Sequence, residues 1–267
     1  MKYIDKTIPE IKQKAHELLK KFIDGQWQQD DNRYINLAYK HFKNGEFREL
    51  LLNEQKHYCC YCMKHILNTE TTLEHIIPDK AIYPAIFDQY NSFGDINANV
   101  FFWQDNMRTS KINIMPPFPH ILAYENLVAS CNGHIPKEGY AKCCNRKRGS
   151  KNIIPVFYLS NANMVFEYDI NGIIICDEKY NNTISCLDLE HTTLQLFRRC
   201  WLNLPSQYDA LDVINASTDE ELRNQIIDDI NISIVSISDR ATIRTELYWS
   251  SFMNYFWFYL YKLDKGL

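Results

Sequence analysis

Cysteines in two widely separated parts of the chain have the spacing of metal ligands. Cys59 and Cys62 form a Cys-x-x-Cys pair, and Cys131 and Cys144 lie far downstream. Zinc binds four thiolates in a tetrahedron and does not fix the length of chain between them, so both pairs can converge on one structural zinc ion. We take Cys144 as the fourth ligand, with the neighbouring Cys143 as the open alternative. A thioredoxin-like redox pair is disfavoured, because no βαβ pattern surrounds the Cys-x-x-Cys pair.

The composition of the chain is that of a globular protein. Hydrophobic residues make up 46% and charged residues 23%, which excludes wholesale disorder. No apolar stretch approaches the roughly 20 residues of a membrane span, and the N-terminus lacks the apolar segment of a secretory signal. We therefore expect a cytoplasmic protein without membrane contact. In that compartment, the nine cysteines favour metal binding over disulfides.

A glutamate–histidine pair lies between the two cysteine groups. Glu74 and His75 are followed by Pro78, and residues 72–77 are predicted to form a short strand. An imidazole exchanges its proton near neutral pH, so His75 suits the role of general base in the hydrolysis of a phosphodiester bond. Taken alone, a histidine in this setting is more often structural.

Two asparagines complete a pattern that runs from the first cysteine pair to the last cysteine. Asn126 lies in an Asn-Leu step before Cys131, and Asn145 directly follows Cys144. The order Cys-x-x-Cys, Glu-His-x-x-Pro, Asn-Leu, Cys, Cys-Asn resembles the HNH (ββα-metal) nucleases that carry a four-cysteine zinc site. In detail it is similar to the PtuB-type proteins of Septu-like and retron-linked anti-phage systems. The resemblance is strongest over about residues 47–151.

The resemblance implies a metal-dependent endonuclease acting on nucleic acid, with DNA as the expected substrate and a PtuA-like ATPase as partner. It implies that Glu74 and Asn145 bind a catalytic Mg²⁺ or Mn²⁺, ions that prefer hard oxygen donors. It also implies that Asn126 orients the His75 imidazole by hydrogen bonding. The zinc ion then fastens distant segments so that these groups meet. The alternatives are an RNase, for example one directed at tRNA, and a non-catalytic zinc-ribbon binding module.

A basic run follows the last cysteine. The net charge of −4 argues against a protein that coats nucleic acid without selectivity, so contact with nucleic acid must use a local basic patch. Arg146, Lys147 and Arg148 are predicted to bind backbone phosphates, which carry no sequence information. Related motifs have lysine where this chain has Arg148, and here Lys147 comes one position earlier.

The predicted fold class is α+β, with a small ββα-metal HNH core and a zinc knuckle between flanking helices. The core is expected over residues 58–180. It includes an insertion at residues 79–120, which is too long and too aromatic for a plain loop. It also includes a β-hairpin, because Asn171-Gly172 between apolar runs is a strong hairpin signal.

Helical regions are predicted on both sides of this core. Residues 1–57 show apolar residues at helical spacing, and one of the expected helices covers residues 34–42. Residues 181–267 are expected to form the C-terminal helical region. Its final helix is predicted over about residues 239–262 and carries aromatic side chains on nearly every face, so it must be buried.

Overall fold

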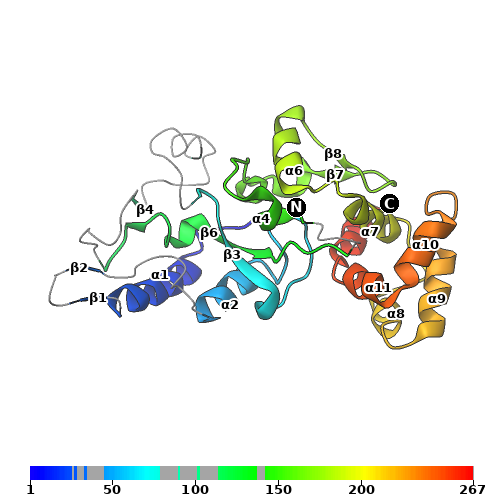
Figure 1. Cartoon of the computed structure of the whole chain (residues 1–267), viewed down its shortest axis with the longest axis horizontal. Helices are drawn as coiled ribbons and strands as arrows, with labels where there is room; N and C mark the ends of the chain where they lie inside the picture. The colour runs from blue at the N-terminus through cyan, green and yellow to red at the C-terminus, as the bar shows by residue number, and fades with distance from the viewer. Residues whose placement is uncertain are drawn as a thin grey trace.

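A computed structural model of the chain combines helices with small sheets, which agrees with the α+β part of the predicted fold class. It describes residues 1–25, 27–28, 33–34, 45–78, 90, 101–102, 114–136 and 142–266. Within these residues, helices form most of the regular structure, and the strands pair two by two. The N-terminal helices lie at one end of the elongated molecule and the C-terminal helices at the other, with a two-stranded sheet between them (Figure 1).

Among the described residues of the N-terminal region, two helices pack together and one small strand pair forms. Helix α1 (Pro9–Asp24) begins with a proline, whose missing N–H costs nothing in the first turn, and it buries four residues at helical spacing. Helix α2 (Gly45–Glu54) packs against α1 through a buried leucine-rich face. The strands β1 (Trp27–Gln28) and β2 (Arg33–Tyr34) pair antiparallel. Most of the helix predicted over residues 34–42 lies outside the described residues.

The centre of the molecule is an antiparallel strand pair crossed by a short helix. Strand β3 (Thr71–His75) pairs with β6 (Leu127–Cys131) over their full lengths, with Thr71 opposite Cys131 and His75 opposite Leu127. Helix α4 (Cys144–Arg148) packs on β6. Short 3-10 turns, η2 (Asn68–Glu70) and η4 (Tyr124–Asn126), lead into the two strands. This confirms the strand predicted over residues 72–77. The observed strand begins one residue earlier and ends two residues earlier than predicted.

The chain between β3 and β6 is described only in part. Strand β4 (Phe101–Phe102) pairs in parallel with β5 (Phe118–Pro119). The rest of the expected insertion, apart from Tyr90 and the residues from 114 on, lies outside the described part of the chain.

The predicted hairpin is present in a shorter form. After the 3-10 turn η5 (Val156–Tyr158) and helix α5 (Ala162–Val165), strand β7 (Glu167–Tyr168) pairs antiparallel with β8 (Ile174–Ile175). Gly172 has φ +78° in the connecting turn, a conformation that glycine adopts without strain. The apolar run before the turn is strand only in part, because Met164 and Val165 belong to α5.

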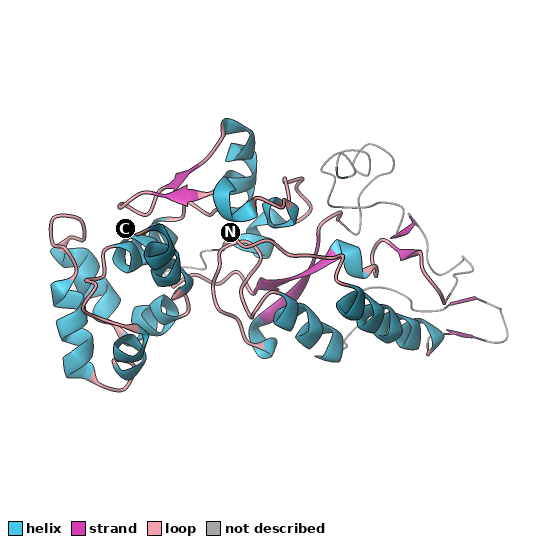
Figure 2. Ribbon diagram, turned by 180° about the vertical axis from the view of Figure 1, so that it is seen from behind, coloured by secondary structure: helices cyan, strands magenta, loops and turns pink. Residues whose placement is uncertain are grey.

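The C-terminal region is helical, as the sequence predicts. Its elements are η6 (Glu178–Tyr180), α6 (Asn181–Leu187), α7 (Thr192–Leu202), α8 (Ala210–Asn215), α9 (Glu220–Asp229), α10 (Ile237–Arg244), α11 (Glu246–Met253) and α12 (Trp257–Lys265). Figure 2 shows α7 to α12 gathered at one end of the molecule, whereas α6 packs against α4 nearer the centre.

The single final helix predicted over residues 239–262 is wrong: the chain breaks there into α10, α11 and α12. Thr245 is extended, with ψ 142°, and separates the first two. The broken chain wraps around α7, where the Trp201 ring stacks on Phe252 with centroids 4.2 Å apart and its Nε1 donates to the Phe252 carbonyl.

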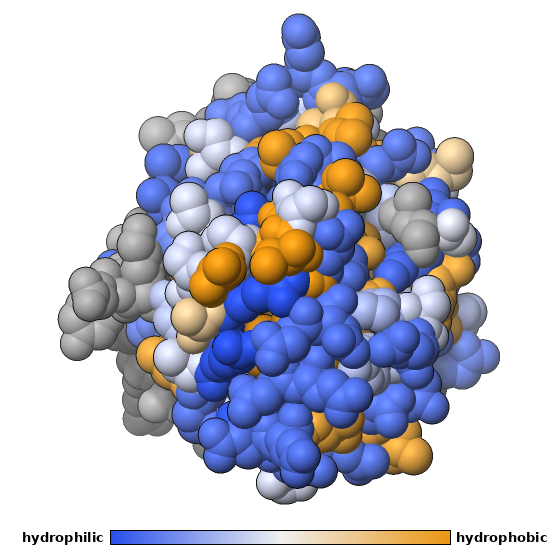
Figure 3. All heavy atoms as spheres, turned by 90° about the vertical axis from the view of Figure 1, so that its right-hand side faces the viewer, coloured by the Kyte–Doolittle hydropathy of each residue, from blue (hydrophilic) through white to orange (hydrophobic). Residues whose placement is uncertain are grey.

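The far surface of these C-terminal helices is mainly hydrophilic with several apolar patches (Figure 3). Exposed apolar side chains of α8, α10 and α11 include Leu211, Ile214, Ile237 and Leu247. In the described part of the chain, no helix combines the length and apolar character needed to cross a membrane.

Candidate metal centre and hydrolytic site

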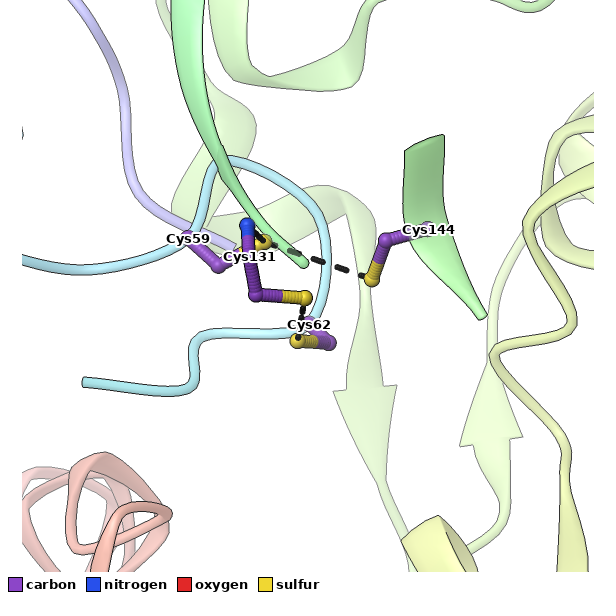
Figure 4. Close-up of side chains that lie close together, drawn as sticks. All are labelled: Cys59, Cys62, Cys131 and Cys144. Carbon is purple, nitrogen blue, oxygen red and sulfur yellow. Dashed lines mark hydrogen bonds between the residues drawn. The ribbon is translucent and has the colours of Figure 1, made fainter. Parts of the chain in front are cut away.

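The cysteine pairs predicted to bind zinc meet in one buried cluster. The sulfur atoms of Cys59, Cys62, Cys131 and Cys144 all lie within 4.8 Å of one another (Figure 4). The Cys59 and Cys144 sulfurs are 4.0 Å apart, and those of Cys62 and Cys131 are 3.9 Å apart. Tetrahedral zinc with Zn–S bonds of about 2.3 Å places its sulfurs about 3.8 Å apart. The cluster can therefore bind a metal ion such as zinc.

Backbone turns bring these sulfurs together. The Met63 N–H donates to the Cys59 carbonyl, and the Cys59 N–H donates to the Lys64 carbonyl, which closes the Cys-x-x-Cys loop. Met63 has φ +62°, and Cys144, at the start of α4, has φ +53°. The fourth member of the group is Cys144, and the thiol of the preceding Cys143 lies beside the group, where it forms hydrogen bonds with Cys62, Cys131 and Cys144.

Hydrogen bonds to the sulfurs suit a thiolate cluster. The Cys131 N–H donates to the Cys59 sulfur at 3.3 Å, and the Tyr255 hydroxyl lies 3.8 Å from the Cys62 sulfur. Burial raises the pKa of Cys59, but hydrogen bonds from neighbouring cysteines hold it well below its usual value. The pKa values of Cys62 and Cys144 are raised well above the usual value, chiefly by burial, and that of Cys131 chiefly by a hydrogen bond with Cys143. Tyr255 lies between α11 and α12, so the C-terminal helices contribute directly to the surroundings of the cluster.

His75 ends β3 at the opposite end of the strand pair from Cys131. Its side chain is half-buried, and its Nε2 lies 2.8 Å from the Ile121 carbonyl oxygen. A carbonyl can only accept, so Nε2 carries the proton, and in a neutral imidazole Nδ1 is then the basic nitrogen. The arrangement is compatible with the predicted role of His75 as a general base.

Asn126 holds the backbone beyond His75 and does not bond to the imidazole, contrary to the prediction. Its Oδ1 accepts from the Ile77 N–H at 2.7 Å. Its Nδ2 donates to the Ile77 carbonyl at 2.9 Å and to the His120 carbonyl at 2.8 Å. Both amide hydrogens are thus taken by carbonyls. Any influence of Asn126 on His75 acts through the position of the main chain.

Arg148 is buried, so its predicted role as a substrate-binding residue is wrong. It is 1% exposed, and its Nη1 lies 2.5 Å from Glu74 Oε1. The Tyr61 hydroxyl also donates to this carboxylate oxygen, at 3.0 Å. Burial raises the pKa of Glu74, although the Arg148 charge opposes that shift. A buried carboxylate needs such a counter-ion, which explains why the guanidinium faces inward.

Glu74 and Asn145 were predicted to share a catalytic divalent ion. Asn145 Nδ2 donates to Thr72 Oγ1 at 3.1 Å. Thr72 and Glu74 are two residues apart on β3, so their side chains lie on the same face, and α4 brings Asn145 to that face. The side chain of His75, the next residue along β3, lies on the opposite face. No described group donates to Glu74 Oε2 or Asn145 Oδ1. These oxygens fit the donor chemistry of Mg²⁺ or Mn²⁺.

Arg146 and Lys147 remain on the surface, as expected of a phosphate-binding patch. Arg146 Nη1 lies 3.0 Å from the His134 Nε2, and Lys147 forms an exposed ion pair with Asp188 at 3.4 Å. Lys142 and Lys151 are exposed near the same helix. Ion pairs that are exposed to water contribute little to stability, so these cations can exchange their partners for the phosphates of a polyanion.

A buried ion pair that no sequence motif indicates supports the turn containing Asn126 from the N-terminal side. Lys6 Nζ lies 2.6 Å from Glu54 Oε2, and both side chains are almost fully buried. The Tyr124 hydroxyl, in the turn that includes Asn126, donates to the other oxygen of Glu54. These residues lie on three separate elements, and no local spacing in the sequence indicates that they meet.

Replacing Asn126 with alanine is expected to destabilise the fold strongly. The change leaves the Ile77 N–H and two carbonyls buried without partners, each costing about 1–3 kcal/mol, so we expect a total loss of roughly 3 kcal/mol or more. The measurement is the free energy of unfolding in urea. Asn161, which is exposed and makes no side-chain capping bond, gives the matched control: Asn161→Ala should change stability by less than about 0.5 kcal/mol. Equal stability of both variants would contradict the assigned role of Asn126.

Comparison of the chain with protein-family models, with curated proteins and with solved structures gave no match.

Proposed function

We propose that the chain is a metal-dependent endonuclease of the HNH (ββα-metal) class that hydrolyses phosphodiester bonds in DNA. The observation that carries the proposal is the position of His75. It lies at the end of β3 that points away from the four cysteines, with Asn145 on the helix that crosses the strand pair. The pairing of β3 with β6 and the packing of α4 on β6 support the proposal, because the sequence resemblance implies two antiparallel strands and a helix around the site.

The residues divide the work of hydrolysis among them. His75 accepts the proton of the attacking water, and its hydrogen bond to the Ile121 carbonyl fixes the tautomer. Glu74 and Asn145 would hold a Mg²⁺ or Mn²⁺ ion, which supplies charge stabilisation to the phosphate when bound. Arg146 and Lys147 hold the nucleic-acid backbone near the site. The four cysteines would hold a zinc ion with a structural role, which takes no part in the reaction.

The biological setting is proposed from the sequence resemblance. There the nuclease is the effector of a cytoplasmic anti-phage system and works with a PtuA-like ATPase. The net charge of −4 supports a need for such a partner, because an acidic nuclease is repelled by its own substrate until it is brought there.

A second candidate is a zinc-stabilised binding module without catalysis. One observation favours it: the Glu74 carboxylate is already neutralised by Arg148 and so does not need a metal ion. An RNase uses the same residues as the proposed DNase and differs only in substrate.

A cleavage assay separates these functions. The purified chain, alone and with its ATPase, is incubated with plasmid DNA, linear duplex and RNA in Mg²⁺, Mn²⁺ or EDTA. The proposal predicts DNA cleavage that depends on Mg²⁺ or Mn²⁺ and is lost in EDTA. Cleavage of RNA alone would support the RNase, and an absence of cleavage in every arm would support the binding module.

A further inference from the structure

The guanidinium of Arg148 is the centre of a buried network at the end of β3. It is planar and has five N–H donors in a fixed fork, so it can hold several acceptors in one arrangement. The acceptors are Tyr61 Oη at 3.1 Å, Glu74 Oε1 at 2.5 Å, the His75 carbonyl at 2.6 Å, the Ile76 carbonyl at 2.5 Å, Tyr90 Oη at 3.3 Å and the Lys151 carbonyl at 3.0 Å. Three of these belong to consecutive residues of the segment that contains the candidate general base.

We infer that Arg148 is a positioning residue that couples the metal-binding cysteines to the segment containing Glu74 and His75. Tyr61 makes this connection because it lies within the Cys-x-x-Cys loop and its hydroxyl contacts both Arg148 and Glu74. Arg148 also lies in the same short helix as Cys144, a member of the cysteine cluster. Metal binding by the cysteines therefore fixes the position of Arg148, which donates to the end of β3. It also fixes the Cys-x-x-Cys loop that contains Tyr61.

The same contacts argue against a direct role in binding substrate. The Arg148 side chain has no exposed surface, and its charge is balanced by a carboxylate that is itself almost completely buried. A phosphate could reach it only if this network opened. The coupling is a property of the fold, and only its effect on cleavage rests on the proposed function.

The test compares Arg148→Lys with Lys147→Met, which removes an exposed cation from the same helix. Lysine keeps the charge but cannot reproduce the fork. The first readout is hydrogen exchange at the Ile76 and Ile77 amides, which donate to the Asn126 carbonyl and side chain. We expect Arg148→Lys to lower their protection roughly tenfold, and Lys147→Met to leave it unchanged. Tyr61→Phe, which removes one hydroxyl, is the milder variant should Arg148→Lys not fold, and it should lower the same protection.

Nucleic-acid binding and cleavage provide the second readout. With divalent ions absent, Lys147→Met should weaken DNA binding and reduce its salt slope by about 1, while Arg148→Lys should leave both unchanged. In cleavage, Arg148→Lys should lower kcat by roughly 10–100-fold and leave KM unchanged. Native amide protection in both Arg148→Lys and Tyr61→Phe would overturn the inference. So would an Arg148→Lys variant that loses DNA affinity as Lys147→Met does. If even the unmodified chain neither binds nor cuts nucleic acid, the proposed function fails, and amide protection still decides the role of Arg148.

Discussion

Replacing Cys144 with serine is expected to remove the bound metal and most of the stability of the central region. Three sulfurs remain within reach of one another, but a hydroxyl is a poor ligand for zinc beside thiolates. Apparent binding energies of structural zinc reach about 10–16 kcal/mol, which exceeds the usual stability of a domain. The expected result is a fall from about one zinc per chain to almost none after dialysis against a chelator, together with a lower melting temperature.

Cys143→Ser is the matched control, because it changes the neighbouring buried cysteine that is not part of the four-cysteine group. It should retain zinc, with at most a small loss of stability. Retention of zinc by Cys144→Ser and its loss from Cys143→Ser would show that the other cysteine is the ligand. Equal loss from both would show that the local backbone, and not one thiolate, determines binding.

Replacing His75 with alanine is expected to lower the rate of DNA cleavage by about 10²–10⁴-fold, the usual contribution of a general base. The side chain makes a hydrogen bond to the Ile121 carbonyl, so a modest loss of stability of about 1 kcal/mol should accompany the change. The measurement is the single-turnover rate on a labelled duplex at saturating Mn²⁺. Zinc content should stay unchanged, because His75 lies at the opposite end of the strand pair from Cys131.

His57→Asn provides the control for this variant. His57 has φ +61°, a conformation that asparagine tolerates, and its ring stacks on His65 with centroids 5.9 Å apart. The control should cleave at the rate of the unmodified chain. Cleavage that continues at that rate in His75→Ala would remove His75 from the mechanism.

The cysteine cluster was predictable because a tetrahedral zinc ion can bind four sulfurs whatever the length of chain between them. The choice between Cys143 and Cys144 was not predictable, since the two residues are adjacent in sequence and only the positions of their sulfurs in the fold distinguish them. Strand β3 was predictable from its position before Pro78. Strand β6 was not, because all of its residues are buried and it shows no alternation of buried and exposed positions. The hairpin around Gly172 followed from local turn chemistry alone.

Other features depend on contacts that no local pattern encodes. Arg148 belongs to a basic run, and such runs are usually exposed, but its partner Glu74 lies 74 residues earlier in the chain. Asn126 was expected to hold the imidazole, and the backbone carbonyls that take its amide hydrogens come from the long segment between the strands. The broken C-terminal helix likewise reflects the need of its aromatic side chains to pack around α7.

X-ray absorption at the zinc edge tests most directly whether a thiolate-bound ion holds the two halves of this site together. The account predicts about one zinc per chain, with a first shell of four sulfurs at about 2.3 Å and no nitrogen or oxygen ligand. A first shell that contains nitrogen or oxygen, or a chain purified without stoichiometric metal and still fully folded, would contradict it.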